Sequence, residues 1–236
     1  MNTALIIAGG SGQRMKQDIP KQFLNVYDKP VIIYTLEAFE KHPDIDSIAV
    51  VCLEGWEEIL RAYSKQFNIT KLKWIVKGGE NGQQSIKNGL DILKQHIDED
   101  NIILIHDGNR ALVSLDIISD SIVTCRKYGN AVTAIPCTEV ILKSTNNIAS
   151  KEAIPREELM RTQTPQVFKL SELILAHEEA GKRGINNSLA TCSLMVELGK
   201  EVYFSSGSEK NIKITRTEDI EIFKSILIST KDTWLK

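Results

Sequence analysis

Closely spaced cysteines are absent from this 236-residue sequence. Its four cysteines, Cys52, Cys125, Cys137 and Cys192, lie far apart and form no C-x-x-C pair. Zinc sites and redox motifs rely on closely spaced thiols, so the sequence supports neither. Three of the four cysteines lie within apolar runs, which predicts buried, unpaired thiols in a reducing compartment.

The sequence also lacks an excess of charge and any long apolar run. It has 29 Lys and Arg residues against 31 Asp and Glu residues, so no general basic field attracts nucleic acid or an anionic membrane. No segment approaches the ~20 apolar residues of a membrane-spanning helix, and the first residues show no signal-peptide pattern. We therefore expect a cytoplasmic protein that binds neither nucleic acid nor membrane. Any site for an anion must be local.

Short apolar, β-branched runs alternate with amphipathic segments over the first 136 residues. This alternation predicts parallel strands joined by right-handed helical crossovers, and hence a mostly parallel, doubly wound α/β sheet. Strands are expected at residues 3–8, 47–53, 72–76, 101–106 and 131–136. Helices are expected at residues 30–41, 55–66, 83–97 and 115–128. Ligands bind such a sheet where loops leave the carboxyl ends of its strands, which places Gly9–Lys21, Gly78–Ser85 and Asp107–Arg110 together.

The pattern changes after residue 136. Residues 137–168 contain few large apolar side chains and turn-favouring residues around Asn146–Asn147, which predicts an extended hairpin. Such a hairpin is either a surface excursion or an arm that packs on a second subunit. Further helices are expected near 170–182, near 189–198 and from about 217 to 230, with strands at 200–205 and 211–215. We expect one domain over residues 1–236, with residues 138–165 as the arm.

The segment AGGSGQRMKQDIPKQF directly follows the first predicted strand. Glycines in this position let backbone N–H groups wrap around a phosphate group. Arg14 and Lys21 add two cations, and Pro20 fixes the backbone before Lys21. A dinucleotide-binding G-x-G-x-x-G motif needs a third glycine where Met15 stands, and the G-x-x-x-x-G-K-[ST] motif is absent. The segment therefore predicts a different loop that holds a triphosphate.

Two other motifs follow predicted strands. In HDGNR, Asp107 is a suitable Mg²⁺ ligand and Arg110 can neutralise phosphate charge. His106, at the end of its strand, is more typical of a hydrogen-bonded core residue than of a catalyst. In GGENGQQS, the glycine turn opens a helix, and its backbone together with Ser85 suits contact with the edge of a base.

Five segments, in order, resemble the cytidylyltransferases that make CDP-polyols: AGGSGQRM…PKQF, GGEN…S..NGL, HDGNR, PREELMRTQTPQVF and NIKITRTEDI. That family includes 2-C-methyl-D-erythritol 4-phosphate cytidylyltransferase and ribitol-5-phosphate cytidylyltransferase. The resemblance covers nearly the whole chain. It implies a Rossmann-like nucleotide-diphospho-sugar transferase fold whose protruding β-hairpin arm embraces the partner in a homodimer. It also implies an enzyme that uses CTP and Mg²⁺ to transfer CMP to a polyol phosphate, with release of pyrophosphate.

The same resemblance implies a role for each matched residue. Arg14, Lys21 and Lys213 match cations at the reacting phosphates. The implied nucleotide-binding residues are Ala8, Gly9, Gly10, Gly12, Gly79, Glu80, Ser85 and Asp107. Asp107 also matches the Mg²⁺ ligand. The position of Asn211 close to Lys213 makes it a candidate for the second ligand. The implied acceptor-binding residues are Arg110, Val140, Arg156 and Ala190, with Arg156 reaching the acceptor's phosphate from the neighbouring subunit.

The departures from the family pattern cluster on the acceptor side. Ala190 stands where the family has an aspartate, and Val140 stands where the methylerythritol enzymes have a threonine. A methyl group cannot hydrogen-bond the hydroxyls that a carboxylate would. We therefore expect ribitol 5-phosphate or a related alditol phosphate of capsule or teichoic-acid synthesis as the acceptor. The alternatives are methylerythritol phosphate, for isoprenoid synthesis, and an inactive relative that serves as a binding protein.

Overall fold

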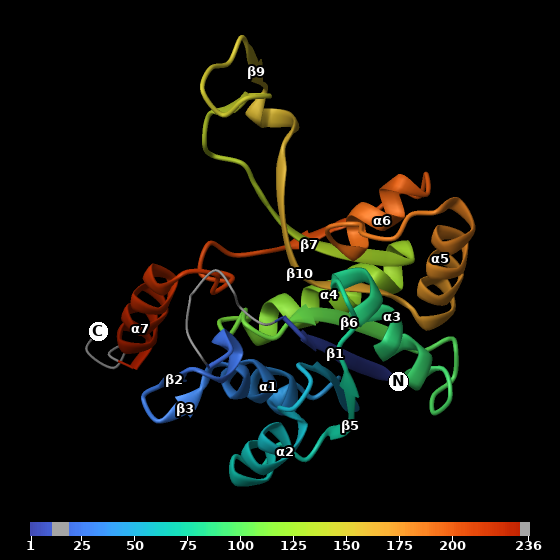
Figure 1. The fold of residues 1–236 in the computed structure, drawn as a ribbon, viewed down its shortest axis with the longest axis vertical. Helices are drawn as coiled ribbons and strands as arrows, with labels where there is room; N and C mark the ends of the chain where they lie inside the picture. Colours follow the sequence, from blue (N-terminus) through green and yellow to red (C-terminus); the bar gives the residue numbers. More distant parts are fainter. Residues whose placement is uncertain (11–18, 232–236) are drawn as a thin grey trace.

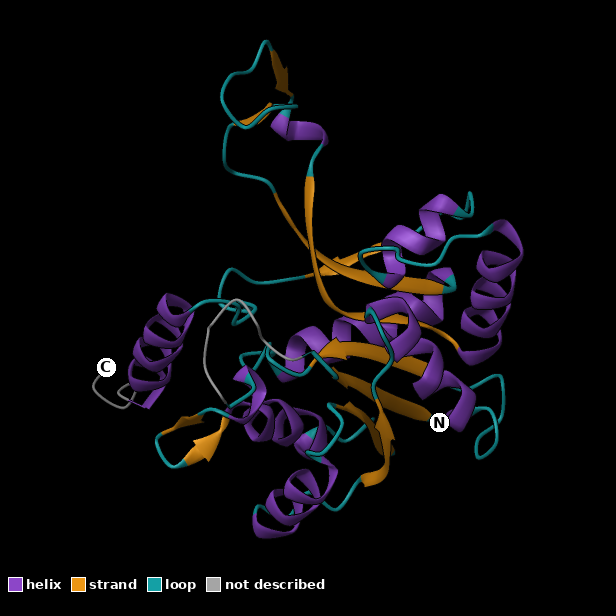
Figure 2. Cartoon of the chain, in the orientation of Figure 1, coloured by secondary structure: helices purple, strands orange, loops and turns teal. Residues whose placement is uncertain are grey.

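A seven-stranded sheet forms the centre of the protein, in the order β11-β7-β10-β6-β1-β4-β5 (Figures 1 and 2). The computed structural model describes residues 1–10 and 19–231. The strands are β1 (Asn2–Ala8), β4 (Ser47–Cys52), β5 (Leu72–Lys77), β6 (Ile102–Asp107), β7 (Asn130–Pro136), β10 (Met160–Lys169) and β11 (Phe204–Ser206). Two short pairs lie outside this sheet: β2 (Asn25–Val26) with β3 (Lys29–Pro30), and β8 (Ile141–Lys143) with β9 (Glu152–Ile154).

Helices cover both faces of the sheet. They are α1 (Val31–Lys41), α2 (Glu57–Gln66), α3 (Gly82–Leu93), α4 (Leu115–Tyr128), α5 (Leu170–Arg183), α6 (Thr191–Glu197) and α7 (Thr217–Lys231), with 3₁₀ turns η2 (Lys21–Phe23) and η3 (Arg156–Glu158). Alternate residues of β1 enter different cores, because successive strand side chains point to opposite faces. Ile6 packs with α1, α2 and α4, whereas Leu5 packs with α3, α5 and α6. Over residues 1–10 and 19–231, no helix is long and apolar enough to cross a membrane.

The predicted doubly wound sheet is confirmed in its first half. β1 lies between β4 and β6 and pairs with both in parallel. Ile7 is opposite Asp107, and Ala8 is opposite Cys52, so the carboxyl ends of the three strands meet at one end of the sheet. The helix expected at residues 115–128 is α4, while α3 ends at Leu93, earlier than the predicted 97.

The second half of the sheet differs from the prediction at three places. β10 was expected only as part of the extended hairpin at 137–168, yet it lies in the central sheet between β6 and β7 and is antiparallel to both. β11 is shorter than the strand expected at 200–205. The strand expected at 211–215 is not formed, because this segment pairs with the loop after β6, where the Ile214 N–H donates to the Asn109 carbonyl at 2.9 Å.

A hairpin projects from the body between β7 and β10 (Figure 1). Its tip pairs β8 with β9 in antiparallel register, Ile141 opposite Ile154, and Asn147 adopts a positive φ of 59° in the turn. Asparagine tolerates this left-handed conformation better than most residues. The return of the hairpin is already part of the sheet from Met160, which pairs with Pro136.

Two helical glycines provide a matched test of packing. A Cβ on Gly89 of α3 would lie 2.6 Å from Leu5 Cδ1, whereas a Cβ on Gly181 of α5 would meet nothing within 4 Å. Gly89→Ala should therefore lower the free energy of unfolding by about 1–3 kcal/mol through overpacking. Gly181→Ala should raise it by about 0.5–1 kcal/mol, because alanine has the better helix propensity. Urea denaturation measures both, and equal effects of the same sign would contradict this packing.

Candidate active site

A cleft of about 530 Å³ opens where β1, β4 and β6 end. The predicted site residues that line it are Ala8, Gly9, Gly10, Lys21, Gly79, Glu80, Ser85, Asp107 and Lys213. They come from four loops that are far apart in the sequence. Gly12 and Arg14, which were also predicted, lie outside the described residues.

Close backbone packing shapes the floor of this cleft. A Cβ on Gly9 would lie 3.3 Å from the Cα of Gly78, so the loops after β1 and β5 approach each other almost backbone to backbone. Gly79 is tighter still, since a Cβ there would be 2.4 Å from Gln84 Cγ. The Gly79 N–H donates to Ser85 Oγ at 3.0 Å, and Asn81 caps α3 by accepting from the Gln84 N–H at 2.9 Å. The glycine turn and the N-terminus of α3 therefore form one fixed unit.

Lys21 is positioned by its neighbour Gln22. The Gln22 side chain is buried, and its Nε2 donates to the carbonyl of Ala8 at 2.7 Å and to that of Gly10 at 3.1 Å. These bonds hold η2 against the end of β1. Pro20, with φ of −59°, precedes this 3₁₀ turn. The arrangement brings Lys21 to the cleft beside the glycines, as the sequence predicted for this part of the loop.

Asp107 lies between two cations. Lys213 Nζ is 2.8 Å from its Oδ1, and Arg110 Nε is 3.4 Å from its Oδ2. Burial alone would raise the pKa of the Asp107 carboxyl, but the charges of Lys213 and Arg110 outweigh it and lower that pKa. Arg110 is itself fixed by a hydrogen bond from Nη1 to the Asn211 carbonyl at 2.6 Å. Asp107 is therefore an ionised carboxylate at the cleft.

His106, next to Asp107, is a core residue. It is fully buried, with Nε2 3.0 Å from the Arg110 carbonyl and Nδ1 3.0 Å from Thr164 Oγ1. Burial lowers its pKa to about 4, so the ring is neutral at physiological pH. Both ring nitrogens are engaged, which fits the structural role expected for it.

A Mg²⁺ ion would find one suitable protein carboxylate in this cleft. The described residues contain no group of three or more His, Cys, Asp or Glu side chains that could hold a metal. Asp107 is an ionised oxygen ligand at the cleft wall, and Mg²⁺ commonly takes one or two carboxylates together with phosphate oxygens. The donor set fits an ion that arrives with a nucleotide. Asn211, the conjectural second ligand, is fully buried and does not line this cleft.

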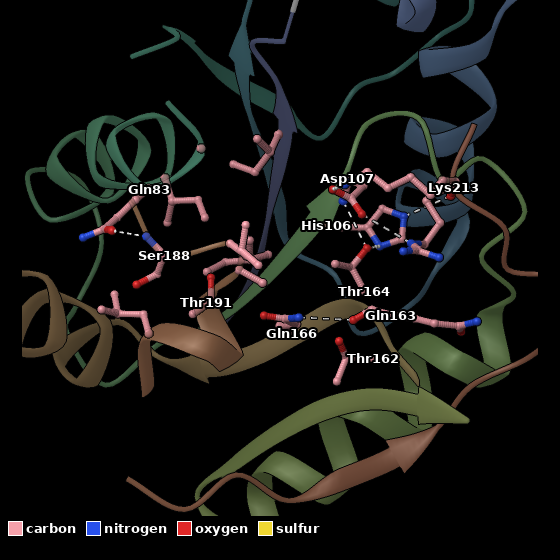
Figure 3. A pocket seen from close by; sticks show the side chains of 18 of the residues that line it. Gln83, His106, Asp107, Thr162, Gln163, Thr164, Gln166, Ser188, Thr191 and Lys213 are labelled. Atoms are coloured by element: carbon pink, nitrogen blue, oxygen red, sulfur yellow. Dashed lines mark hydrogen bonds and ion pairs between the residues drawn. The ribbon is translucent and has the colours of Figure 1, made fainter. Parts of the chain in front are cut away.

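A second pocket, of about 280 Å³, adjoins the cleft. The two share Ile7, Gly82, Asp107 and Lys213. The pocket runs on between α3, β10 and α6, and Ala190 and Arg110 lie in its wall. Figure 3 shows Asp107, Lys213 and His106 at one side of this pocket, with Gln83 and Ser188 at the other.

Sequence reasoning assigned no role to several polar residues of this pocket. They include Gln83, Gln163, Thr164, Gln166, His177, Ser188 and Thr191. The QTPQ segment of β10 contributed to the family resemblance, and that motif was the signal available for Gln163, Thr164 and Gln166. His177 and Thr191 belong to amphipathic helices, where periodicity indicates core packing and nothing more.

Val140 and Arg156 lie on the hairpin and line neither the cleft nor the pocket of the same chain. Val140 is 78% exposed. The Arg156 guanidinium contacts its own hairpin, with Nη1 3.4 Å from the Thr138 carbonyl and Nε 3.4 Å from Glu157 Oε1. Within one chain, the structure therefore does not bring these two predicted acceptor-binding residues to the others.

The family model for 2-C-methyl-D-erythritol 4-phosphate cytidylyltransferase (IspD) matches residues 2–229. The chain belongs to this cytidylyltransferase family. The family and the nucleotidyltransferase fold predicted from the sequence are both confirmed.

Individual relatives carry two different names within the family. The chain is 45% identical over 229 residues to a ribitol-5-phosphate cytidylyltransferase of Lacticaseibacillus paracasei, covering 96% of this chain and 98% of that one. It is 39% identical over 234 residues to a 2-C-methyl-D-erythritol 4-phosphate cytidylyltransferase of Clostridium acetobutylicum, covering 96% and 97%. The structure of 4-diphosphocytidyl-2C-methyl-D-erythritol synthase from Anaerococcus prevotii superposes with a TM-score of 0.81 at 24% identity, covering 96% and 95%.

The ion pair at the centre of the site gives a pH-dependent prediction. The lowered pKa of Asp107 contributes stability that is present above the ordinary Asp pKa near 3.9 and is lost as pH falls through the folded-state pKa. Lys213→Met should raise the pKa of Asp107, because the closest cation is removed while burial remains. Carboxyl NMR titration measures this shift. Lys210→Met, an exposed charge in the same segment, is the control and should leave Asp107 unchanged; an equal response in both variants would contradict the pairing.

Proposed function

We propose that this cytidylyltransferase is a cytoplasmic, Mg²⁺-dependent enzyme that transfers CMP from CTP to ribitol 5-phosphate or a closely related alditol phosphate. One observation carries the proposal: a cleft built from glycine turns and cations continues, through Asp107 and Lys213, into a pocket whose walls combine apolar side chains with amide and hydroxyl groups. The cleft suits a triphosphate, and the pocket suits a polyol.

The chemistry requires charge neutralisation more than proton transfer. An oxygen of the acceptor's phosphate attacks the α-phosphorus of CTP in line, the bond from that phosphorus to the bridging oxygen breaks, and pyrophosphate leaves. A phosphate dianion is already a nucleophile, so no general base is needed. Both reactants are polyanions, and their approach is favoured by fixed cations and by correct orientation. We assign these cationic roles to Lys21, Lys213 and Arg14.

The nucleotide is assigned to the glycine turns. The backbone of Ala8, the last residue of β1, and of Gly9 and Gly10 after it is assigned to the phosphates, and the turn at Gly79 and Glu80 is assigned to the base; all of them line the cleft. Ser85 is 4% exposed and accepts a bond from the Gly79 N–H, which supports a role in holding that turn in shape. Asp107 would hold Mg²⁺ with the phosphate oxygens, and the ion would neutralise charge there when bound.

Two findings favour a ribitol-type acceptor over methylerythritol phosphate. The 45% identical relative is named a ribitol-5-phosphate cytidylyltransferase, whereas the 39% identical one is named for methylerythritol phosphate. In addition, the pocket wall carries the methyl group of Ala190 where the family pattern has an aspartate. A pocket that has lost this carboxylate is suited to a different arrangement of acceptor hydroxyls.

The hairpin is proposed to act on a second copy of the chain. It exposes large apolar side chains, with Val140 at 78%, Leu142 at 59% and Ile148 at 89%. A two-stranded hairpin is marginally stable by itself, and exposed apolar patches mark interaction surfaces. Since Arg156 lies far along this arm, a homodimer would supply it to the partner's acceptor pocket.

Pyrophosphate release with CTP and Mg²⁺ over a panel of polyol phosphates tests the activity. We expect turnover with ribitol 5-phosphate, and a lower kcat/KM with methylerythritol phosphate. Replacement of CTP by ATP should abolish most of the turnover. Turnover with methylerythritol phosphate alone would overturn the acceptor assignment. Absence of turnover with every acceptor would favour the inactive binding protein.

Heterodimers with different substitutions test the arm. Lys21→Ala alone should lower kcat by at least ~10²-fold. If Arg156 acts on the partner's site, a heterodimer of one Lys21→Ala chain and one Arg156→Ala chain retains one intact site, and roughly half of the wild-type activity. The control places both substitutions in one chain and pairs it with a wild-type chain, which leaves no intact site. If Arg156 instead acts within its own chain, the two activities are reversed.

A further inference from the structure

Two buried polar atoms in the acceptor pocket lack a protein partner. Among the described residues, the unpartnered buried side-chain atoms are Ser64 Oγ, His177 Nε2, Thr191 Oγ1 and Asn211 Oδ1. Of these residues, His177 and Thr191 line the pocket beside Asp107. Thr191 is 3% exposed and His177 is 7% exposed. A buried polar atom without a partner is unfavourable in a folded protein, so a ligand or water that supplies the missing hydrogen bond is favoured at His177 Nε2 and Thr191 Oγ1.

Several neighbouring polar side chains of the pocket are hydrogen-bonded within the protein. Gln83 accepts from the Ser188 N–H at 2.8 Å and donates to the Ile185 carbonyl at 2.7 Å. Ser188 Oγ in turn donates to Glu197 at 2.8 Å. These bonds tie the loop before α6 to the first turn of α3, as Figure 3 shows for Gln83 and Ser188.

The same holds on the β10 side of the pocket. Gln166 accepts from the Cys192 N–H at 2.8 Å, and Thr164 Oγ1 contacts both the Asp107 N–H and His106. In Figure 3, Thr191 lies between the Gln83–Ser188 bond and Gln166. Gln83, Ser188, Gln166 and Thr164 therefore fix the pocket walls, whereas Thr191 Oγ1 and His177 Nε2 are the buried atoms of this lining that still lack a hydrogen-bond partner.

The two ends of the pocket differ in charge. The charged residues lie at the end where the pocket meets the cleft. Asp107 and Lys213 line both, and Arg110 lies beside Asp107 in the pocket wall. Thr191 and His177 line the pocket but not that cleft. Burial lowers the pKa of His177 to about 4, assisted by Lys87 and opposed by Asp91. Its ring is thus neutral at physiological pH, and a neutral ring suits a hydroxyl better than a phosphate.

We propose that Thr191 Oγ1 and His177 Nε2 hydrogen-bond the hydroxyl groups at the end of the acceptor polyol that is remote from its phosphate. This pair then selects the length and configuration of the polyol, while the charged end holds the phosphate for attack. The inference rests on the proposed function, because it requires the acceptor to be a phosphorylated polyol. It does not depend on which polyol this is. A site with hydrogen-bonding groups for substrate hydroxyls discriminates strongly against acceptors that lack them.

Thr191→Val is the sharpest test, because valine keeps the shape and removes only the hydroxyl. The KM for the acceptor should rise about 3- to 10-fold, as expected for the loss of one neutral hydrogen bond, with the KM for CTP unchanged. Thermal stability of the unliganded protein should stay equal or increase, since the lost hydroxyl has no protein partner. A purely structural role would instead lower the Tm.

His177→Leu should raise the acceptor KM by a similar factor. His177→Gln, which restores a neutral hydrogen-bonding group, should recover part of the loss. Ser64→Ala is the matched control: Ser64 Oγ is also buried without a partner, but it lies in α2 and not in this pocket. The control should leave both KM values unchanged.

The outcomes separate this inference from the proposed function. An unchanged acceptor KM in both Thr191→Val and His177→Leu, or an equal increase in Ser64→Ala, overturns the role of the pair. If the wild-type protein uses only methylerythritol phosphate, the proposed acceptor fails, and the same KM ratios measured with that substrate decide the role of the pair. If no acceptor is used, both proposals fail.

Discussion

The active site depends on β1 pairing in parallel with two strands at once. Because Ile7 is opposite Asp107 and Ala8 is opposite Cys52, the chain leaves three strands at the same level of the sheet. That level is where Gly9 meets Gly78, and where Asp107 reaches a cation from a segment 106 residues further along the chain. A slip of one residue in this register would turn Asp107 to the opposite face of the sheet and separate it from Lys213. The apolar cores on both faces make such a slip costly.

Local sequence patterns predict the first half of the fold, where strands and helices alternate along the chain. The strands β1, β4, β5 and β6 and the helix α4 have unmistakable apolar patterns, and the structure has them close to the expected residues. The place of β10 in the sheet cannot be predicted in this way. Its sequence, MRTQTPQVFK, contains Pro165 and several polar residues and does not alternate between apolar and polar residues. Its position between β6 and β7 is fixed by partners from distant segments. The reverse error occurs at residues 211–215, where a strand-like sequence pairs with a loop through Asn109.

The same distinction applies to the site. The sequence predicted Lys21 and Asp107 as site residues because each lies in a motif that follows a predicted strand. Lys213 was predicted through the family resemblance alone. Thr191 and His177 gave no signal, since a threonine and a histidine on amphipathic helices ordinarily pack in a core. Thr191 Oγ1 and His177 Nε2 stand out only in the structure, because several pocket residues near them are hydrogen-bonded while these two buried atoms have no partner. Such a property exists only in three dimensions.

β10 is shared between the hairpin and the sheet. Its first residues, Met160–Thr162, pair with β7 at the base of the hairpin. Its last residues, from Gln166, pair with β7 on one side and β6 on the other, and the β7 register shifts between Thr162 and Gln166. Gln163 and Thr164, at that shift, line the pocket beside the cleft and hold the segment that carries Lys213 through Asn211. The hairpin and the pocket are thus connected directly through β10. A chimaera that takes the hairpin together with β10 from another family member would therefore also replace Gln163 and Thr164 in the pocket wall.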